Sequence, residues 1–161
     1  MKILVVSDTH RKDDNLKLVL SEECPLDMLI HLGDAEGSEH FIPGWVNPEC
    51  RMEMVLGNND FFSRLDRERE IDIAGHKAFI THGHYYGVSM GPEGLVDEAK
   101  SRGCDIAMYG HTHRPFLDVI DGVTVLNPGS LSYPRQEGRR PSYMIIHVDA
   151  DGKMDYQQKY L

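Results

Sequence analysis

Cysteine is scarce in this sequence, and its spacing excludes two kinds of protein. The 161 residues contain three cysteines, Cys24, Cys50 and Cys104, which lie far apart and form no Cys-x-x-Cys pair. An odd number at such wide spacing argues against a disulfide framework and against a thiolate zinc site. Neither a disulfide-stapled fold nor a cysteine-ligated zinc site is therefore expected.

Long apolar runs are also missing. The first apolar run, residues 3–6, is too short for a signal peptide, and no small-residue cleavage site follows it. No window approaches the ~18 consecutive apolar residues that a membrane span requires. We therefore expect a cytoplasmic protein that makes no contact with membranes.

Basic residues are outnumbered. Lysine and arginine total 17 against 26 aspartate and glutamate residues, which gives a formal net charge of −9. Long nucleic acids and anionic membranes bind to clustered lysine and arginine side chains. A general binding surface for DNA, RNA or lipid is therefore not expected.

The length limits the chain to one domain. A chain of this size buries about 69% of its unfolded surface, which supports one core but not two ordinary domains. No repeat, low-complexity segment or linker interrupts the sequence. We expect residues 1–161 to form a single domain, and a homo-oligomer of that domain is compatible with the sequence.

Short apolar runs bounded by Gly, Asn or Asp predict the strands, and runs of this kind are typical of strands buried on both faces. They fall at residues 3–6, 28–32, 52–56, 78–80, 106–109, 123–126 and 143–148. Turn signals at 74–77, 121–122 and 150–152 predict hairpins.

Two helical patterns lie between these runs. The first begins at Asp13 or Asp14, which could cap it, and ends before Pro25. The second begins near Pro92 and stops at Gly103. The order of strands, helices and hairpins predicts an α/β sandwich of mixed sheets flanked by helices.

What the sequence has in abundance is histidine, with nine residues that can bind metals or move protons near neutral pH. Five of these histidines lie in segments that directly follow predicted strands: His10, His82, His84, His111 and His113. The segments concerned are Ser7-Asp8-Thr9-His10, Gly33-Asp34, Gly57-Asn58-Asn59-Asp60, Thr81-His82-Gly83-His84 and Gly110-His111-Thr112-His113. In open α/β sheets, ligands bind beyond the carboxyl ends of the strands, so these five segments are expected to share one rim.

The residue types in these segments suit a pair of divalent metals. Imidazole nitrogen, carboxylate and amide oxygen without thiolate favour borderline first-row ions. Asp-x-His and His-x-His each supply two ligands from one short extended segment. The glycines before Asp34, Asn58 and His111 allow sharp turns and let a substrate approach the backbone. Each motif alone is weak, but all five in order predict one metal site.

The series of motifs resembles the calcineurin-like metallophosphoesterases, and more closely their small single-domain YfcE-type phosphodiesterases. The resemblance extends from residue 3 to Asn127-Pro128-Gly129-Ser130. It implies a four-layer αββα sandwich of two mixed β-sheets flanked by helices. It also implies two divalent metal ions, with Mn expected first and Ni, Co, Fe or Zn as alternatives.

The resemblance further implies which residues hold the metals. One ion would be held by Asp8, His10, Asp34 and His113, and the other by Asp34, Asn58, His82 and His111, with Asp34 shared. Two ions about 3.5–4 Å apart polarise phosphoryl oxygens and lower the pKa of a bridging water. The expected function is hydrolysis of small phosphodiesters by the resulting metal-bridging hydroxide. A phosphomonoesterase and a non-catalytic protein-binding scaffold, as in the retromer subunit of this fold, are the alternatives.

The segment after the third strand departs from the family pattern. Asn59 stands where many members have a histidine that protonates the leaving group, and an amide cannot do so. Asn59 is instead a candidate to hydrogen-bond a substrate oxygen, and His84 is a candidate proton donor. Asp60 is expected to orient the loop.

Two further segments flank the motifs. Phe61 and Phe62 follow Asp60 and form either an apolar wall for a base or aryl group, or a contact that packs a loop or a second subunit. The basic segment 133–141 is expected to be a solvated loop, with a cap over the site or a partner contact as the alternatives.

Overall fold

Five strands form the first sheet in the computed structural model, which describes all residues, 1–161. They are β1 (Lys2–Val6), β2 (Met28–His31), β3 (Arg51–Met54), β9 (Ser142–Val148) and β10 (Met154–Tyr160), in the order β10-β9-β1-β2-β3. β1, β2 and β3 are parallel, whereas β9 is antiparallel to both β1 and β10. β1 therefore lies in the interior of the sheet, between strands that are far apart in the sequence.

The second sheet also has five strands and is also mixed. They are β4 (Glu68–Ile73), β5 (His76–Thr81), β6 (Ile106–Met108), β7 (Pro115–Ile120) and β8 (Val123–Pro128), in the order β4-β5-β6-β8-β7. β5, β6 and β8 are parallel, and the two edge strands pair antiparallel with their neighbours.

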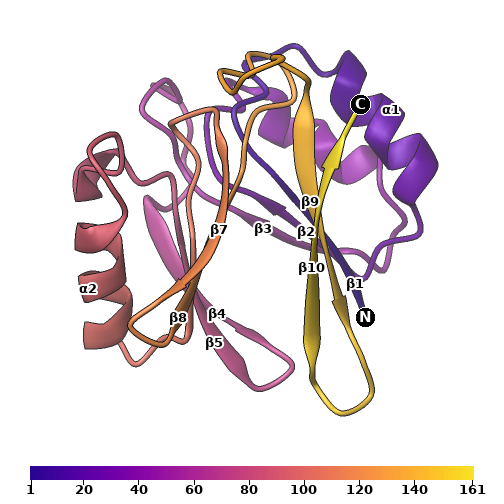
Figure 1. Cartoon of the computed structure of the whole chain (residues 1–161). Helices are drawn as coiled ribbons and strands as arrows, with labels where there is room; N and C mark the ends of the chain where they lie inside the picture. Colours follow the sequence, from indigo (N-terminus) through magenta and orange to yellow (C-terminus); the bar gives the residue numbers. More distant parts are fainter.

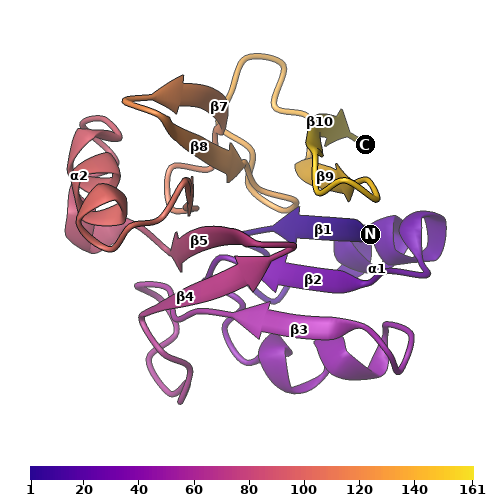
Figure 2. The same ribbon diagram turned by 90° about the horizontal axis from the view of Figure 1, so that it is seen from below.

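The two sheets pack face to face, and each is covered on its outer face by a helix. α1 (Asp14–Glu23) lies on the first sheet and α2 (Glu93–Ser101) on the second, at opposite sides of the molecule (Figures 1 and 2). Three short 3₁₀ turns, η1 (Ser38–His40), η2 (Ile42–Gly44) and η3 (His84–Tyr86), complete the chain. The predicted α/β sandwich of two mixed sheets flanked by helices is confirmed.

The continuous apolar run of β1 is explained by burial on both faces. Ile3 and Val5 belong to the cluster between the sheets, while Leu4 and Val6 belong to the cluster beneath α1. All four side chains have no exposed surface, and each buried aliphatic side chain of this size contributes about 1.5–3 kcal/mol. A strand with one solvated face would instead alternate apolar and polar residues.

Two local predictions need correction. α1 does begin at Asp14, but the Asp13 side chain makes no capping hydrogen bond and instead accepts one from Ser38 Oγ at 2.6 Å. β3 ends at Met54, two residues before the predicted end, because the Leu56 N–H bonds to the Asp66 carbonyl in the next loop. No helix is long and apolar enough to cross a membrane.

One buried carboxylate connects the two ends of the chain. Glu23 in the last turn of α1 accepts from the ammonium groups of Lys2 and Lys159 and from the Tyr143 hydroxyl. Burial raises the pKa of Glu23, but hydrogen bonds from Lys159, Lys2 and Tyr143 outweigh it and lower the pKa to about 2. A depressed carboxyl pKa stabilises the fold above the unfolded pKa of about 4.3, and this contribution is lost as the pH falls toward the folded value.

Glu23→Gln is therefore expected to lower the free energy of unfolding by about 2–3 kcal/mol at pH 7, because it removes a buried carboxylate that two lysine ammonium groups and a tyrosine hydroxyl stabilise. Between about pH 4 and pH 2 the variant should lose less stability than the parent, since it has no carboxyl to protonate. Urea denaturation from pH 7 to pH 2 measures both effects. Glu22→Gln, at an exposed position on the same helix turn, is the matched control. Equal stability of Glu23→Gln and the parent at pH 7 would contradict the role of this network.

Candidate metal centre

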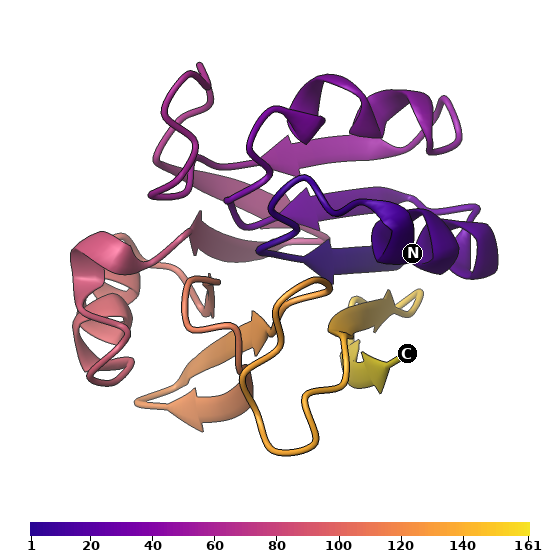
Figure 3. The same cartoon turned by 90° about the horizontal axis from the view of Figure 1, so that it is seen from above.

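The carboxyl ends of β1, β2, β3, β5 and β6 meet at one end of the molecule, and the loops that follow them converge there (Figure 3). These loops carry all seven residues predicted to bind metal: Asp8, His10, Asp34, Asn58, His82, His111 and His113. The first three motifs come from the first sheet and the last two from the second. The structure therefore brings residues up to 105 positions apart into one cluster, at the common rim that was expected for these five segments.

The side chains in this cluster are within ligand distance of one another. His113 Nε2 lies 3.1 Å from Asp8 Oδ1, and Asp34 Oδ2 lies 3.4 Å from His82 Nε2 and 3.7 Å from His10 Nε2. Two groups of three donors can each surround one ion, with all donor atoms within 4.8 Å: Asp8, His10 and His113 in one, Asp8, Asp34 and His82 in the other. Both groups are buried or nearly so.

Asn58 connects the second part of the cluster. Its Oδ1 lies 3.0 Å from His82 Nε2 and 2.9 Å from His111 Nδ1. The amide oxygen and the two imidazoles therefore converge on a common point beside Asp34.

The outer nitrogens of three histidines determine which lone pairs point inward. His82 Nδ1 lies 2.6 Å from the Leu32 carbonyl, and His113 Nδ1 lies 2.8 Å from the Tyr133 carbonyl. Carbonyl oxygens only accept, so both Nδ1 atoms carry the proton, and in a neutral ring Nε2 is then an acceptor. A carboxylate oxygen of Glu36 lies 2.6 Å from His10 Nδ1. This nitrogen therefore also carries the proton, and His10 Nε2 is the acceptor in the neutral ring. Such partners are typical of metal-binding histidines.

The centre consequently holds acceptors that face one another. His10 Nε2 and His113 Nε2 are 3.3 Å apart, and Asp8 Oδ1 between them is buried without a hydrogen-bond donor. Facing lone pairs repel, and a buried carboxylate oxygen without a partner is costly. A cation at this point would satisfy all three atoms at once, so the residues present fit a divalent metal.

The pKa values describe the same electrostatics. Burial raises the pKa of Asp8, but contacts with His113 and His82 more than offset it and hold the pKa below its usual range. Burial likewise raises the pKa of Asp34, but His82 and the Asn59 hydrogen bonds lower it overall. Both carboxylates are therefore anionic at neutral pH. Burial and neighbouring histidines lower the pKa of His111, which favours the neutral imidazole that a metal requires.

Backbone strain is concentrated in the same loops. Non-glycine residues with φ between 47° and 66° include Asp8, His10, Asp34, His111 and His113. This left-handed region is uncommon for residues with a side chain, and such residues cluster at functional sites because the surroundings over-determine them. All five of these residues are predicted metal ligands.

Glycines allow the loops to approach one another closely. A Cβ at Gly57 would lie 2.1 Å from Asp34 Oδ1, and one at Gly110 would lie 2.0 Å from Ser7 Oγ. The sequence led us to expect that these glycines admit a substrate. The close neighbours are instead protein atoms of the adjoining motifs, so the glycines permit assembly of the cluster itself.

Asp60 holds the loops together beneath the cluster. Its carboxylate accepts from the backbone N–H groups of Asp34 at 2.8 Å, Gly57 at 2.7 Å and Glu36 at 2.6 Å. The prediction that Asp60 orients the loop is confirmed.

The two residues considered for assistance to the leaving group have different surroundings. Asn59 donates its backbone N–H to Asp34 Oδ1 at 2.8 Å and its side-chain amide to Asp34 Oδ2 at 2.7 Å, so it contacts a predicted metal ligand directly. The His84 ring lies 5.5 Å from that of His82 and 6.0 Å from that of His111, and its Nδ1 is buried without a partner. Burial, together with His82 and His111, lowers the pKa of His84.

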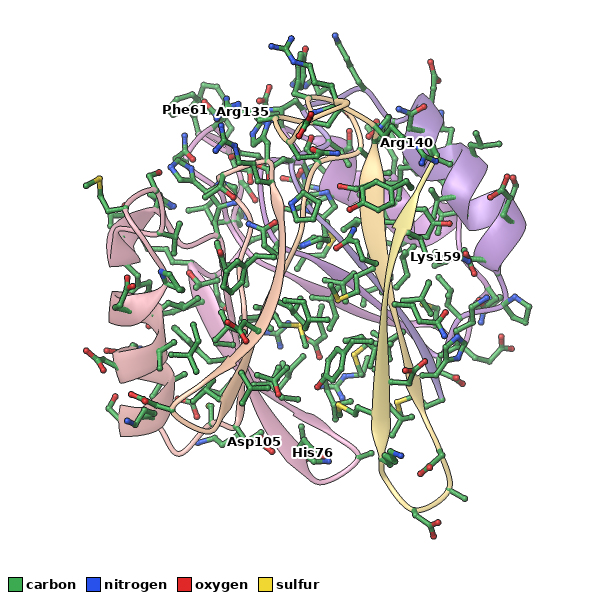
Figure 4. All side chains as sticks on the ribbon, in the orientation of Figure 1. Phe61, His76, Asp105, Arg135, Arg140 and Lys159 are labelled. Atoms are coloured by element: carbon green, nitrogen blue, oxygen red, sulfur yellow. The ribbon has the colours of Figure 1, made fainter.

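Two cavities adjoin the centre, and Asn59 and Glu36 line both. The smaller, about 410 Å³, includes Phe61 and Phe62, which are 79% and 99% exposed and so do not pack into the protein. The larger, about 740 Å³, includes His10 and His113. Phe61, beside the first cavity, and Arg135, beside the second, lie at the same end of the molecule (Figure 4).

Several contributors were missed by the sequence analysis. Glu36 binds His10, and Ser7 Oγ donates to Asp8 Oδ2 at 2.6 Å. Glu36 lies two residues after Asp34, so its position in the same loop could have predicted that it lies near the cluster. The roles of the Leu32 and Tyr133 carbonyls could not be predicted from the sequence, because every residue has a backbone carbonyl.

An α/β sandwich with two buried Asp/His clusters at its strand ends is the architecture of a metallophosphoesterase. Residues 1–151 match the family model of the calcineurin-like phosphoesterase superfamily domain. The chain belongs to this family, and it is a probable metallophosphoesterase.

The matches extend over most of this chain and most of each relative. The chain is 31% identical over 152 residues to the probable metallophosphoesterase YsnB of Bacillus subtilis, covering 94% of this chain and 86% of the relative. It is 32% identical over 173 residues to the phosphodiesterase YfcE of Escherichia coli, covering 92% and 89%. A solved structure described as a novel archaeal phosphodiesterase is 28% identical, with a TM-score of 0.78 and complete coverage of both chains.

A solved Vps29 structure from Entamoeba histolytica has a TM-score of 0.79 at 22% identity and covers 100% of this chain and 99% of its own. At this identity the likeness shows the fold alone.

Proposed function

We propose that this protein is a binuclear-metal-dependent phosphodiesterase acting on small phosphodiesters. The observation that carries the proposal is the convergence of acceptor atoms on the buried and unpartnered Asp8 Oδ1. The named phosphodiesterase YfcE supports the reaction class. Because both sheets supply residues of the cluster, we also propose that residues 1–161 act as one domain.

The ligand sets follow the two halves of the cluster. One ion would be held by Asp8, His10, Asp34 and His113, and the other by Asp34, Asn58, His82 and His111. Asp34 would be the shared ligand, since its Oδ2 faces His10 of one half and His82 of the other. Two carboxylates against two divalent ions leave a net positive hollow in an acidic protein, which favours binding of a phosphate anion. Imidazole, carboxylate and amide donors suit Mn²⁺, with Ni²⁺, Co²⁺, Fe²⁺ or Zn²⁺ as alternatives.

When bound, two divalent ions polarise phosphoryl oxygens and lower the pKa of a bound water, so that hydroxide is supplied near neutral pH. The chain's own contribution is to hold the donor atoms in place. Glu36 and the Leu32 and Tyr133 carbonyls fix three imidazole orientations, while Asn59 fixes the Asp34 carboxylate. Asn59 lines both cavities and is also placed to hydrogen-bond a substrate oxygen. His84 is the candidate for proton delivery to the leaving group.

Two other functions are less well supported, one by the relatives and the other by the site. A phosphomonoesterase would use the same metals, and the relatives named as phosphodiesterases favour the diester. A scaffold of this fold would have no need of the buried clusters, the strained loops and the orphaned Asp8 oxygen, all of which are present.

Protein stripped with a chelator and reloaded with Mn²⁺ is expected to hydrolyse bis-p-nitrophenyl phosphate, with p-nitrophenyl phosphate as the weaker substrate. Titration should load about two ions per chain and raise the melting temperature, since the metal binds the folded state. Release of p-nitrophenol by the parent, Asn59→Ala and His84→Ala measures catalysis and the two candidate side-chain roles. A protein that binds no divalent metal and hydrolyses neither ester would contradict the proposal and favour the scaffold.

A further inference from the structure

Three arginines without acidic partners line the larger cavity beside the metal centre. They are Arg114, Arg135 and Arg139, and their side chains form no ion pair and donate no hydrogen bond within the protein. Of the other seven arginines, three pair with carboxylates, whereas Arg11, Arg64, Arg67 and Arg140 form no ion pair and do not line this cavity. Unpaired guanidinium groups that gather at one cavity of an acidic protein are positioned for an external anion.

The loop that carries two of these arginines is attached to the metal centre. The Arg135 N–H donates to the His113 carbonyl at 3.0 Å, and His113 Nδ1 donates in return to the Tyr133 carbonyl at 2.8 Å. Arg114 is the next residue after His113. The basic segment 133–141, which was expected to be a solvated loop, is exposed but is bound to a predicted metal ligand.

A tight turn keeps the second loop arginine at the cavity. The Arg139 N–H donates to the Gln136 carbonyl at 3.0 Å, and Arg139 itself has a positive φ of 46°. The turn folds the segment back, so Arg135 and Arg139 line the same cavity although they are four residues apart. Arg140, the next residue, points elsewhere, because its guanidinium lies over the Tyr160 ring and donates to the Leu161 carbonyl.

The composition of the cavity determines what it can bind. His10 and His113 line it together with the three arginines, so one ligand in the cavity reaches both the metal centre and the guanidinium groups. Glu36 is the one carboxylate among the lining residues, and it is already bound to His10 Nδ1. A volume of about 740 Å³ is in the range of pockets that hold a small organic ligand.

We propose that Arg114, Arg135 and Arg139 bind a second phosphate of the substrate, so that the preferred substrates are small phosphodiesters that carry an additional terminal phosphate. Guanidinium groups bind phosphate through paired, charge-assisted hydrogen bonds. The proposal rests on the proposed function, because it places the scissile phosphate at the metal centre and the terminal phosphate at the arginines.

Two chromogenic esters of one nucleoside test this substrate class. Thymidine 5′-(p-nitrophenyl phosphate) has a free 3′-hydroxyl, and its 3′-phosphorylated form adds the terminal phosphate. The Mn²⁺-loaded protein is expected to have a kcat/KM about 10–100-fold higher for the phosphorylated form, since a hydrogen bond to a charged group contributes about 1.5–3 kcal/mol. The double variant Arg135→Gln/Arg139→Gln should lose this advantage, so that its kcat/KM is the same for the two esters.

Arg140→Gln is the matched control, because it removes a positive charge from the same loop but outside the cavity (Figure 4). It should leave the preference for the phosphorylated ester unchanged. Equal kcat/KM for the two esters in the parent, or an equal loss of preference in Arg140→Gln, would overturn the proposal while the phosphodiesterase activity stands.

A binding measurement separates this inference from the proposed function. Calorimetric titration of metal-stripped protein with thymidine 3′,5′-bisphosphate requires no catalysis, and the parent should bind at least about tenfold more tightly than Arg135→Gln/Arg139→Gln. If no ester is hydrolysed with any metal, the proposed function fails, and this titration still decides the arginine site. Equal affinity of the two proteins would overturn it.

Discussion

Asp34→Asn is expected to reduce phosphodiester hydrolysis by about 10³-fold or more, since the shared ligand accounts for several kcal/mol of charge stabilisation at the metals. Asp34 Oδ2 faces His10 of one half and His82 of the other. Asparagine preserves the size of the side chain but removes its charge. It also replaces one carboxylate oxygen with an N–H donor, which no metal accepts as a ligand.

Metal content and fold must be measured beside the rate of that variant. Elemental analysis after reloading should show a reduced metal content per chain, and the far-UV spectrum should match that of the parent. Asp97→Asn, at an exposed position on α2, removes the same charge far from the loops and should keep full activity. If Asp34→Asn retained turnover and full metal content, the shared ligand would have to be another residue, and Asp8, which belongs to both three-residue groups, would be the first to examine.

Gly57→Ala is expected to have the second largest effect, although it changes neither a charge nor a ligand. The added Cβ would lie 2.1 Å from Asp34 Oδ1 and 2.3 Å from the Asp34 nitrogen, so both the carboxylate and the backbone must move. Overpacking of this kind costs about 1–3 kcal/mol of stability. A displacement of about 1 Å in a catalytic group costs about 10²-fold in rate.

Thermal unfolding and kcat with Mn²⁺ measure the two effects of Gly57→Ala separately. Gly44→Ala is the control, because a Cβ there has no neighbour within 4 Å. It should change the rate very little. A Gly57→Ala enzyme with the parent's kcat would show that the loop tolerates the methyl group and that Asp34 is less constrained than the structure indicates.

The location of the site could be predicted from the sequence because four of the five motifs follow strands with a continuous run of buried residues, and only β3 begins with an exposed residue, Arg51. Ile3–Val6 leads to Asp8 and His10 in this way, and Ile106–Met108 leads to His111 and His113. An apolar run both marks the strand and fixes the point where polar chemistry begins. The contacts that orient the ligands could not be predicted, because they end on backbone carbonyls or on side chains of other loops.

The strands without apolar runs could be predicted only from the turn sequences next to them. β4 and β7 are edge strands, and β4 alternates exposed and buried residues, with Ile71 and Ile73 buried and Asp72 exposed. The turns at 74–75 and 121–122 predicted a partner strand without giving its extent. The capping role of Asp13 was wrong because Ser38, a residue distant in sequence, competes for its carboxylate.

The position of β1 between β2 and β9 has a consequence for the order in which the chain matures on the ribosome. β1 and the loop with Asp8 and His10 are synthesised first, but β1 pairs on one side with Ser142–Val148, and Ser130 Oγ donates to the Asp8 carbonyl at 2.8 Å. The first ligands to emerge are thus among the last to be held in place. Nascent chains that stop before β9 leave one edge of β1 unpaired, and an unpaired apolar strand is the kind of surface that chaperones bind.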